Sequence, residues 1–87
     1  MATPAFIETV MAALKEKLKQ VGINCEVETE PVPGTKLYRL FVISKSFARM
    51  QHSERQNVVW RVAEKTLNER ELMRISMILT MTPDELG

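Results

Sequence analysis

The chain has 87 residues, of which 26% are charged and 45% hydrophobic, with 12 Lys and Arg against 11 Asp and Glu. This length and composition predict one globular domain over residues 1–87, too short for two separate cores. The even charge balance argues against a dedicated non-specific nucleic-acid binder, and a single cysteine with a single histidine excludes an intramolecular disulfide and a structural zinc cluster. Because no membrane-length apolar run and no signal-peptide pattern is present, we expect a cytoplasmic protein that does not enter a membrane.

Residues Pro4–Val21 are predicted to form an amphipathic helix, with Thr3 as N-cap and Pro4 at the first helical position. Its apolar side chains recur every three or four residues and form one stripe: Ile7, Val10, Met11, Leu14, Leu18 and Val21. Gly22 is the expected stop, because glycine readily adopts the left-handed conformation after a last turn. A basic amphipathic helix can also lie on a membrane, but the strand-like sequence that follows favours packing on a sheet.

Residues Ile23–Thr29 alternate strictly between apolar and polar side chains, which predicts a strand with one solvated face. Glu26 and Glu28 lie on the polar side, where aligned carboxylates suit an edge strand. Cys25 lies on the apolar side and is interpreted as a small buried residue. The alternatives are a carboxylate ladder that binds a cation, and a reactive or metal-ligating Cys25 thiol.

The stretch Leu37–Ser44 is apolar almost without interruption and is predicted to be the central strand of a small sheet, covered on both faces. It follows Glu30–Lys36, in which two prolines and a glycine predict an irregular loop. Because this loop is short, the two strands that it joins should be antiparallel neighbours.

The second half of the chain is predicted to begin with an irregular stretch or single helical turn, Lys45–His52, anchored by Phe47. Ser53–Gln56 has the form of a capping box and starts a second helix. Within it Arg55 should bind backbone carbonyls or a carboxylate. Asn68–Arg74 is a polar connection with room for one extra turn. The side chains of the second helix that should face inward are Val59, Val62, Ala63, Thr66 and Leu67.

Residues Ile75–Met81 alternate again and are predicted to be the third strand, followed by a helix start at Thr82–Glu85 that is either cut off or a short closing turn. A strand–helix–strand crossover is right-handed and makes its two strands parallel. We therefore predict an α+β fold, helix–strand–strand–helix–strand, with a three-stranded mixed sheet in the order first, central, third. Either a helix covers each face of that sheet, or the bare face meets a partner.

Several of these residues together resemble the BolA family. Phe47 is followed by Arg55 and Val59, and later by the stretch Ile75–Leu86. The family pattern has a Phe, an Arg-His-Arg that opens the long helix, a third strand, and a closing Thr-Pro-Glu-Glu-Trp. Val32–Gly34 is similar to the Val-Pro-Ala-Gly ahead of the family's second strand. The resemblance covers nearly the whole chain and implies a fold similar to the type II KH domain.

The departures from this pattern fall where the family's chemistry lies. The resemblance implies a protein that shares an iron–sulfur cluster with a monothiol glutaredoxin through a histidine, but Arg74 stands at that position, and arginine cannot ligate iron. The loop Glu30–Lys36 supplies neither Cys nor His. We therefore expect no metal site and no cofactor, with His52 and Cys25 as the only remaining candidate ligands. The Gly-x-x-Gly loop of KH domains is absent from Phe47–Ser53, which has no glycine.

These observations favour a BolA-like adaptor or regulatory protein that acts by binding another protein, a monothiol glutaredoxin being the partner that the resemblance implies. The alternatives are a KH-like nucleic-acid-binding domain, and a fold relic or subunit of unknown function. An enzyme is not expected, because no catalytic set of side chains is visible. The candidate residues for binding a partner or nucleic acid are Lys36, Arg39, Lys45, Arg49, Arg55, Trp60 and Arg74. For these cations the favoured interpretation is a solvated surface that balances Glu26, Glu28 and Glu30, and for Trp60 it is a flank of the core.

Overall fold

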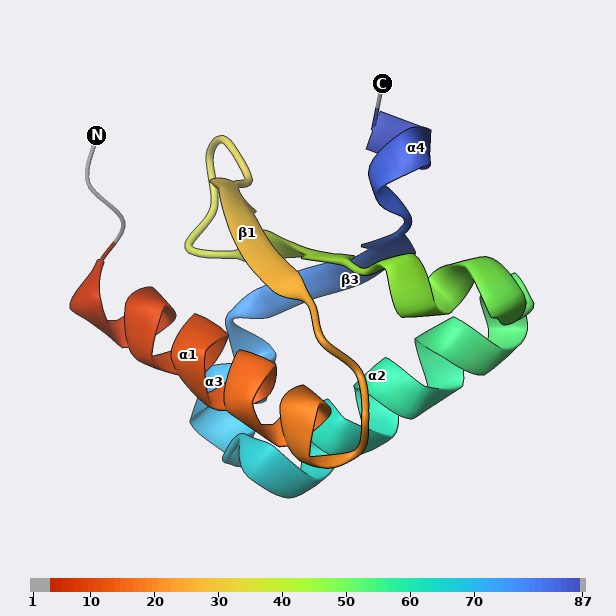
Figure 1. Ribbon diagram of the computed structural model, residues 1–87. Helices are drawn as coiled ribbons and strands as arrows, with labels where there is room; N and C mark the ends of the chain where they lie inside the picture. Colours follow the sequence, from red (N-terminus) through yellow and green to blue (C-terminus); the bar gives the residue numbers. More distant parts are fainter. Residues whose placement is uncertain (1–3, 87) are drawn as a thin grey trace.

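The computed structural model describes residues 4–86 and shows one three-stranded sheet with its long helices packed beneath it (Figure 1). The elements are, in order, α1 (Ala5–Gln20), β1 (Glu26–Pro31), β2 (Tyr38–Ile43), the 3-10 helix η1 (Lys45–Arg49), α2 (His52–Thr66), α3 (Glu69–Met73), β3 (Ile75–Met81) and α4 (Pro83–Leu86). This order confirms the predicted α+β class. Between residues 4 and 86 no helix is both long and apolar enough to cross a membrane.

The sheet has the predicted topology. Its strand order is β1-β2-β3, with β1 antiparallel and β3 parallel to the central strand β2. The helices α2 and α3 form the crossover between the parallel strands, and α3 is the extra turn for which the sequence left room. The bounds of β3 are those predicted, Ile75–Met81.

The first strand lies further along the chain than predicted. β1 covers Glu26–Pro31, so the predicted strand Ile23–Thr29 was wrong at its first three positions, and the predicted loop from Glu30 was wrong at its first two. Pro31 pairs with Tyr38 at the end of the strand. A proline is tolerated there because β1 is an edge strand, where a missing N–H leaves no neighbouring carbonyl unpaired. The alternation nevertheless predicted the buried side correctly, since Ile23 and Cys25 are both buried.

The first helix is one residue shorter than predicted at each end, and the predicted stop at Gly22 is confirmed. The Gly22 N–H donates to the Lys19 carbonyl over 3.0 Å and Gly22 has φ of 89°, so a glycine is required at this stop. Pro4 is the N-cap residue and not the first helical one, and the predicted cap at Thr3 lies outside the described residues. Val21, predicted on the apolar stripe, is 58% exposed because it follows the last helical turn.

The second helix starts one residue before the predicted cap. α2 begins at His52, with Gln51 in an extended conformation before it, and no side chain caps this end. The capping box at Ser53–Gln56 was therefore wrong. The amide of Gln56 instead reaches β3, where its Nε2 donates to the Ile78 carbonyl and its Oε1 accepts from the Thr80 hydroxyl.

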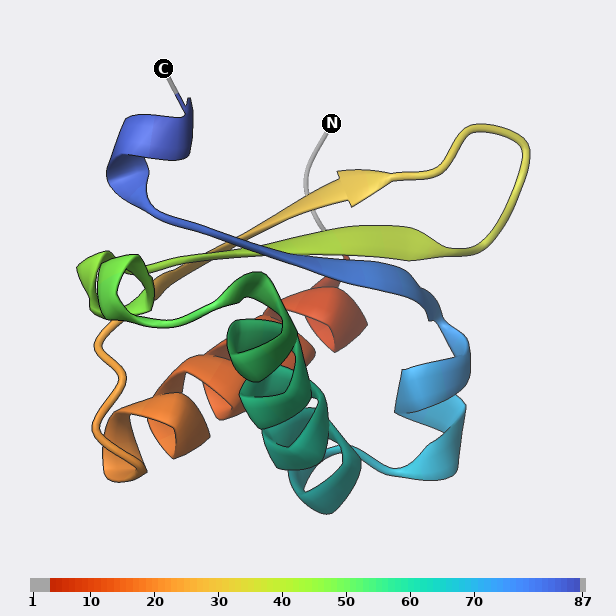
Figure 2. The ribbon, with the colours of Figure 1, turned by 90° about the vertical axis from the view of Figure 1, so that its right-hand side faces the viewer.

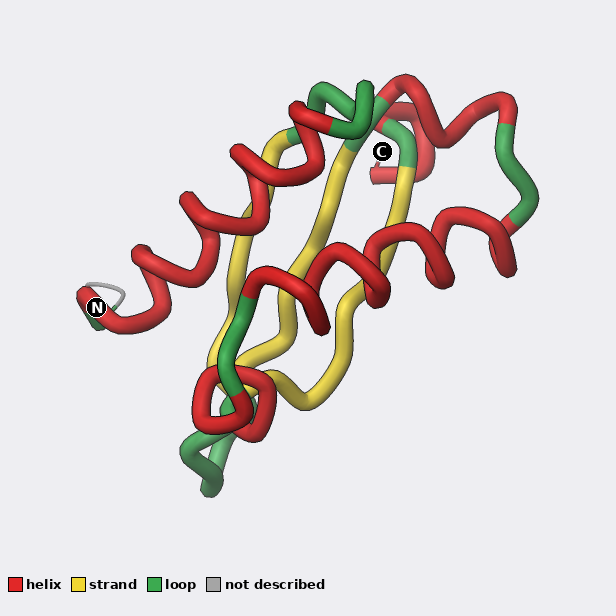
Figure 3. The backbone as a smooth tube through the Cα atoms, turned by 90° about the horizontal axis from the view of Figure 1, so that it is seen from below, coloured by secondary structure: helices red, strands yellow, loops and turns green. Residues whose placement is uncertain are grey.

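The long helices α1 and α2 lie on the same face of the sheet, which Figure 2 shows from the side and Figure 3 from below. Side chains from that face and from the helices make one buried cluster that includes Leu14, Leu40, Phe47, Val59 and Ile78. The prediction that β2 is covered on both faces was therefore wrong. Among residues 4–86 no long helix lies on the opposite face of the sheet, and whether that face meets a partner stays a prediction.

Candidate binding face of the sheet

The uncovered face of the sheet carries nine side chains, three from each strand, which we call the open face. The register places Glu28 beside Phe41 and Phe41 beside Leu79 in the middle row. The rows on either side have the same order, from an acidic residue on β1 to a methionine on β3. The nine residues are Glu26, Glu28 and Glu30 on β1, Arg39, Phe41 and Ile43 on β2, and Met77, Leu79 and Met81 on β3.

A bulge on β3 sets which of its residues face outward. Tyr38 pairs with Ile75 and Arg39 with Met77, so Ser76 is the extra residue in the ladder. Beyond this irregularity Ile78 points into the core, and the residues on either side of it point to the open face.

The β2 and β3 side of the open face is largely apolar and reaches solvent. Met77 is 43% exposed and Leu79 36%, and Phe41 and Met81 are half-buried. Ile43 is buried outside the main cluster and borders a cleft together with Pro83 of α4. Contiguous apolar side chains on a sheet face with no helix over them are typical of a surface that binds another molecule.

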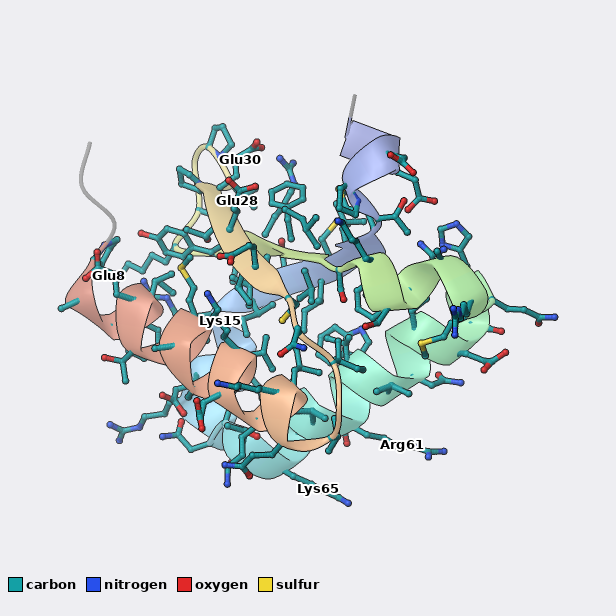
Figure 4. The ribbon with its side chains drawn as sticks, in the orientation of Figure 1. Glu8, Lys15, Glu28, Glu30, Arg61 and Lys65 are labelled. Carbon is teal, nitrogen blue, oxygen red and sulfur yellow. The ribbon has the colours of Figure 1, made fainter. Side chains whose placement is uncertain are left out.

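The β1 side of the open face is acidic. Figure 4 shows Glu28 and Glu30 pointing away from α1, while Lys15 rises from α1 towards β1. The Lys15 ammonium lies 3.1 Å from the carboxylate of Glu26, and Arg39 pairs with Glu30 across the strands. Among residues 4–86, Glu28 forms no ion pair, and it lies in the middle row beside Phe41.

One end of the open face is bordered by α4, which an ion pair at the margin of the core fixes in place. The Arg55 side chain is 7% exposed, and its guanidinium donates from Nη1 to Glu85 Oε1 over 2.9 Å and lies 5.8 Å from the centre of the Phe47 ring. The Thr82 N–H donates to the same carboxylate oxygen over 2.6 Å. This backbone hydrogen bond, and then the one from Arg55, hold the pKa of Glu85 below its ordinary value.

The cations proposed from the sequence do not gather into one surface. Arg55 binds Glu85, as expected of it, and Arg74 lies 5.2 Å from the centre of the Phe6 ring and donates from Nε to the Lys36 carbonyl over 2.7 Å. Only Arg39 belongs to the open face. Of the remaining candidates, Lys36 and Arg49 are exposed on separate elements, Lys45 borders a cleft of about 570 Å³ with Lys15 and Lys19, and Trp60 is half-buried against the core.

The apolar residues of the open face were absent from the candidates proposed from the sequence. A signal for them was present, because Ile75–Met81 alternates but also carries an apolar residue, Ile78, on the side that holds Ser76 and Thr80, and a strand between a helix layer and solvent needs only one apolar side. Three alternate residues of this strand, Met77, Leu79 and Met81, could on that ground have been assigned to a second surface.

Comparison with known proteins supports the fold but does not assign the chain to a sequence family. No family model matches the chain, and no curated protein matches its sequence. Among solved structures, the chain is similar to BolA1 from Arabidopsis thaliana, with a TM-score of 0.56 and 19% sequence identity over 87% of this chain and 94% of that one. The fold is BolA-like.

The residues of this BolA-like fold do not fit an iron–sulfur cluster. Arg74, at the position of the expected ligand, is engaged with Lys36 and Phe6, and the loop before β2 has no Cys or His. Cys25 is buried, and burial raises the pKa of its thiol, which disfavours the thiolate that a metal requires. His52 is 74% exposed at the start of α2, beside Glu85. Within residues 4–86, no three His, Cys, Asp or Glu side chains are grouped to hold a metal ion.

Proposed function

We propose that this protein is a small, single-domain, cytoplasmic adaptor without enzymatic activity, which binds another protein through the open face. The observation that carries the proposal is the exposure of Met77 and Leu79 on a sheet face that no long helix covers. Protein interfaces bury a central apolar patch inside a polar rim, and the open face has both parts in its apolar β3 side and its glutamates. The BolA-like fold agrees with a binding protein.

The test is quantitative capture from native extract by three immobilised forms of the chain. Met77→Ser removes apolar surface from the open face, whereas Met73→Ser removes a 71% exposed methionine from α3, off the sheet. Proteins held by the wild type and by Met73→Ser but lost with Met77→Ser support the proposal. Identical captured sets for all three forms contradict it. A monothiol glutaredoxin, the partner implied by resemblance, should be sought by name among the captured proteins.

Nucleic-acid binding is the alternative function, and the distribution of cations does not favour it. Arg39 and Arg55 are paired with carboxylates, Arg74 is held by the Lys36 carbonyl, and the open face is bordered by glutamates. A phosphate-binding surface would need several free cations together. Titration with a labelled single-stranded oligonucleotide at low and at high salt tests this alternative. A dissociation constant that weakens steeply with salt would restore it.

A further inference from the structure

We infer that the segment bound by the open face is a cationic amphipathic helix of the partner protein. This inference rests on the proposed function and adds the chemistry of the partner. It follows from the arrangement of the nine side chains in rows, each of which runs from a carboxylate on β1 to an apolar side chain on β3.

The apolar side of the open face calls for a helix. A partner strand would add to an edge of the sheet through backbone hydrogen bonds, leaving Phe41 and Leu79 exposed. A helix laid on the face covers these side chains with one apolar stripe, as α1 and α2 do on the opposite face. Met77 and Met81 flank that contact, and flexible thioethers adapt to a partner surface.

The acidic side of the open face selects the charge of that helix. Glu28 lies in the middle row next to the apolar contact and has no cationic partner among residues 4–86. A Lys or Arg on the flank of the apolar stripe of the incoming helix would reach this carboxylate. An acidic segment, a nucleic-acid backbone or an anionic lipid surface would instead be repelled by the Glu28 carboxylate.

A second copy of the chain does not match this surface. If two open faces pack about a two-fold axis that runs across the strands, β1 of one copy covers β1 of the other, so glutamates oppose glutamates. If the axis runs along the strands, β1 covers β3, so Glu28 is buried on apolar side chains near Leu79. Both arrangements desolvate Glu28, which has no cationic partner among residues 4–86, and this is unfavourable.

The experiment uses the full chain and three synthetic peptides of about 18 residues, long enough to form a helix. One has leucine along a single helical stripe and lysine elsewhere. The second replaces every lysine by glutamate, and the third scrambles the first so that no stripe remains. Binding is measured by fluorescence anisotropy, the contact surface is mapped by amide chemical-shift changes, and the mass of the chain alone is measured by sedimentation.

We expect the lysine peptide to bind at least about tenfold more tightly than either of the other two, with weaker binding at high salt. Glu28→Lys should weaken it roughly threefold to tenfold, whereas Glu64→Lys, an exposed change on α2, should not. Leu79→Ser should weaken it about tenfold, and Met73→Ser should leave it unchanged. Circular dichroism of each variant shows whether it is folded.

The outcomes separate the two proposals. Equal binding of the lysine and glutamate peptides, with shifts on the open face, overturns the cationic helix and leaves the proposed function standing. Chemical-shift changes confined to α1 or α2 would show that the peptide helix does not bind the open face, and would overturn the inference. No shift on the open face with any peptide, together with capture that ignores Met77→Ser, overturns both. A concentration-dependent dimer abolished by Leu79→Ser would make the second copy the occupant.

Discussion

Arg55 and Glu85 are 30 residues apart in sequence and join the first turn of α2 to the last turn of the described chain. The guanidinium is buried and its carboxylate partner is 39% exposed, so the pair lies at the margin of the core. The Nε of Arg55 is buried without a hydrogen-bond partner among the described residues. The ion pair thereby holds α4 beside one end of the open face.

The Arg55–Glu85 pair makes folding stability depend on pH. The pKa of Glu85 is lower in the folded chain than in the unfolded one, because the Thr82 N–H and Arg55 bind its carboxylate. The contribution is therefore present above the ordinary pKa of about 4.3 and lost as the pH falls through the lower, folded value. Glu85→Gln should therefore reduce the loss in the free energy of unfolding between about pH 7 and pH 3, an interval that includes the ordinary pKa. Urea unfolding at a series of pH values measures this. Asp84→Asn, on the same turn, is the control, and a matching reduction there would contradict the assignment.

Gln56 is expected to stabilise the packing of α2 on β3. Its amide satisfies the Ile78 carbonyl at 3.0 Å and the Thr80 hydroxyl at 2.8 Å, both part-buried. Gln56→Ala should lower the free energy of unfolding by about 1–3 kcal/mol, because it leaves these groups without a partner. Asn57→Ala, at the exposed neighbouring position, should change it by less than about 0.5 kcal/mol. Equal effects of the two variants in urea would mean that the bridge contributes nothing.

Leu40 and Val62 were both predicted from the sequence to be core residues, but the structure predicts different losses of stability when each is truncated. Leu40 is fully buried, so Leu40→Ala should cost about 2–4 kcal/mol through lost transfer energy and a residual cavity. Val62 is only half-buried, so Val62→Ala should cost clearly less. Val21→Ala, at a 58% exposed position, is the baseline. If Val62→Ala proved as costly as Leu40→Ala in chemical denaturation, the assigned face of α2 would be mistaken.

The helix caps give a further contrast. Ser53 lies inside the first turn of α2 and caps nothing, so Ser53→Ala should be close to neutral. Asn68 accepts from the Glu71 N–H at 2.8 Å, and the Glu71 carboxylate accepts from the Asn68 N–H at 2.8 Å. Asn68→Ala should therefore cost about 1 kcal/mol. A larger fall in melting temperature for Ser53→Ala than for Asn68→Ala would contradict this assignment and indicate that Ser53 is a helix cap.

Iron–sulfur chemistry is expected to fail with this chain. Anaerobic reconstitution with a monothiol glutaredoxin should give the same visible absorption and circular dichroism with and without the protein, because Arg74 and the loop before β2 offer no ligand. Arg74→His is an informative variant, since it restores an imidazole at the expected position. A new spectrum with the wild type that is lost in Cys25→Ser or His52→Ala would identify a ligand and refute this prediction.

Most of the fold followed from local patterns. The stop at Gly22, the central position of β2 and the bounds of β3 depend on glycine conformation, strand composition and alternation, which are properties of neighbouring residues. The crossover rule then fixed the strand order. The place of Pro31 in β1 was not predicted, because a proline can end a strand only where that strand lies at the edge of the sheet.

The candidate site was harder to predict, because its residues are brought together only by the tertiary structure. The apolar run of β2 indicates coverage of both faces but does not distinguish a helix of this chain from a partner. Two of the candidate cations bind groups far along the chain: Arg55 binds Glu85, 30 residues away, and Arg74 binds the Lys36 carbonyl, 38 residues away. The outward direction of Glu26 and Glu28 was predicted correctly, because strand alternation alone determines it.

The two edges of the sheet bear on how the protein behaves at high concentration. Pro31 and the glutamates of β1 hinder the addition of a foreign strand at one edge, and the Gln56 side chain occupies the Ile78 carbonyl on the strand at the other. Growth of the sheet into a cross-β polymer is thereby opposed from both sides. Concentrated samples should therefore resist fibril formation, and Gln56→Ala should be the more aggregation-prone form under mild agitation.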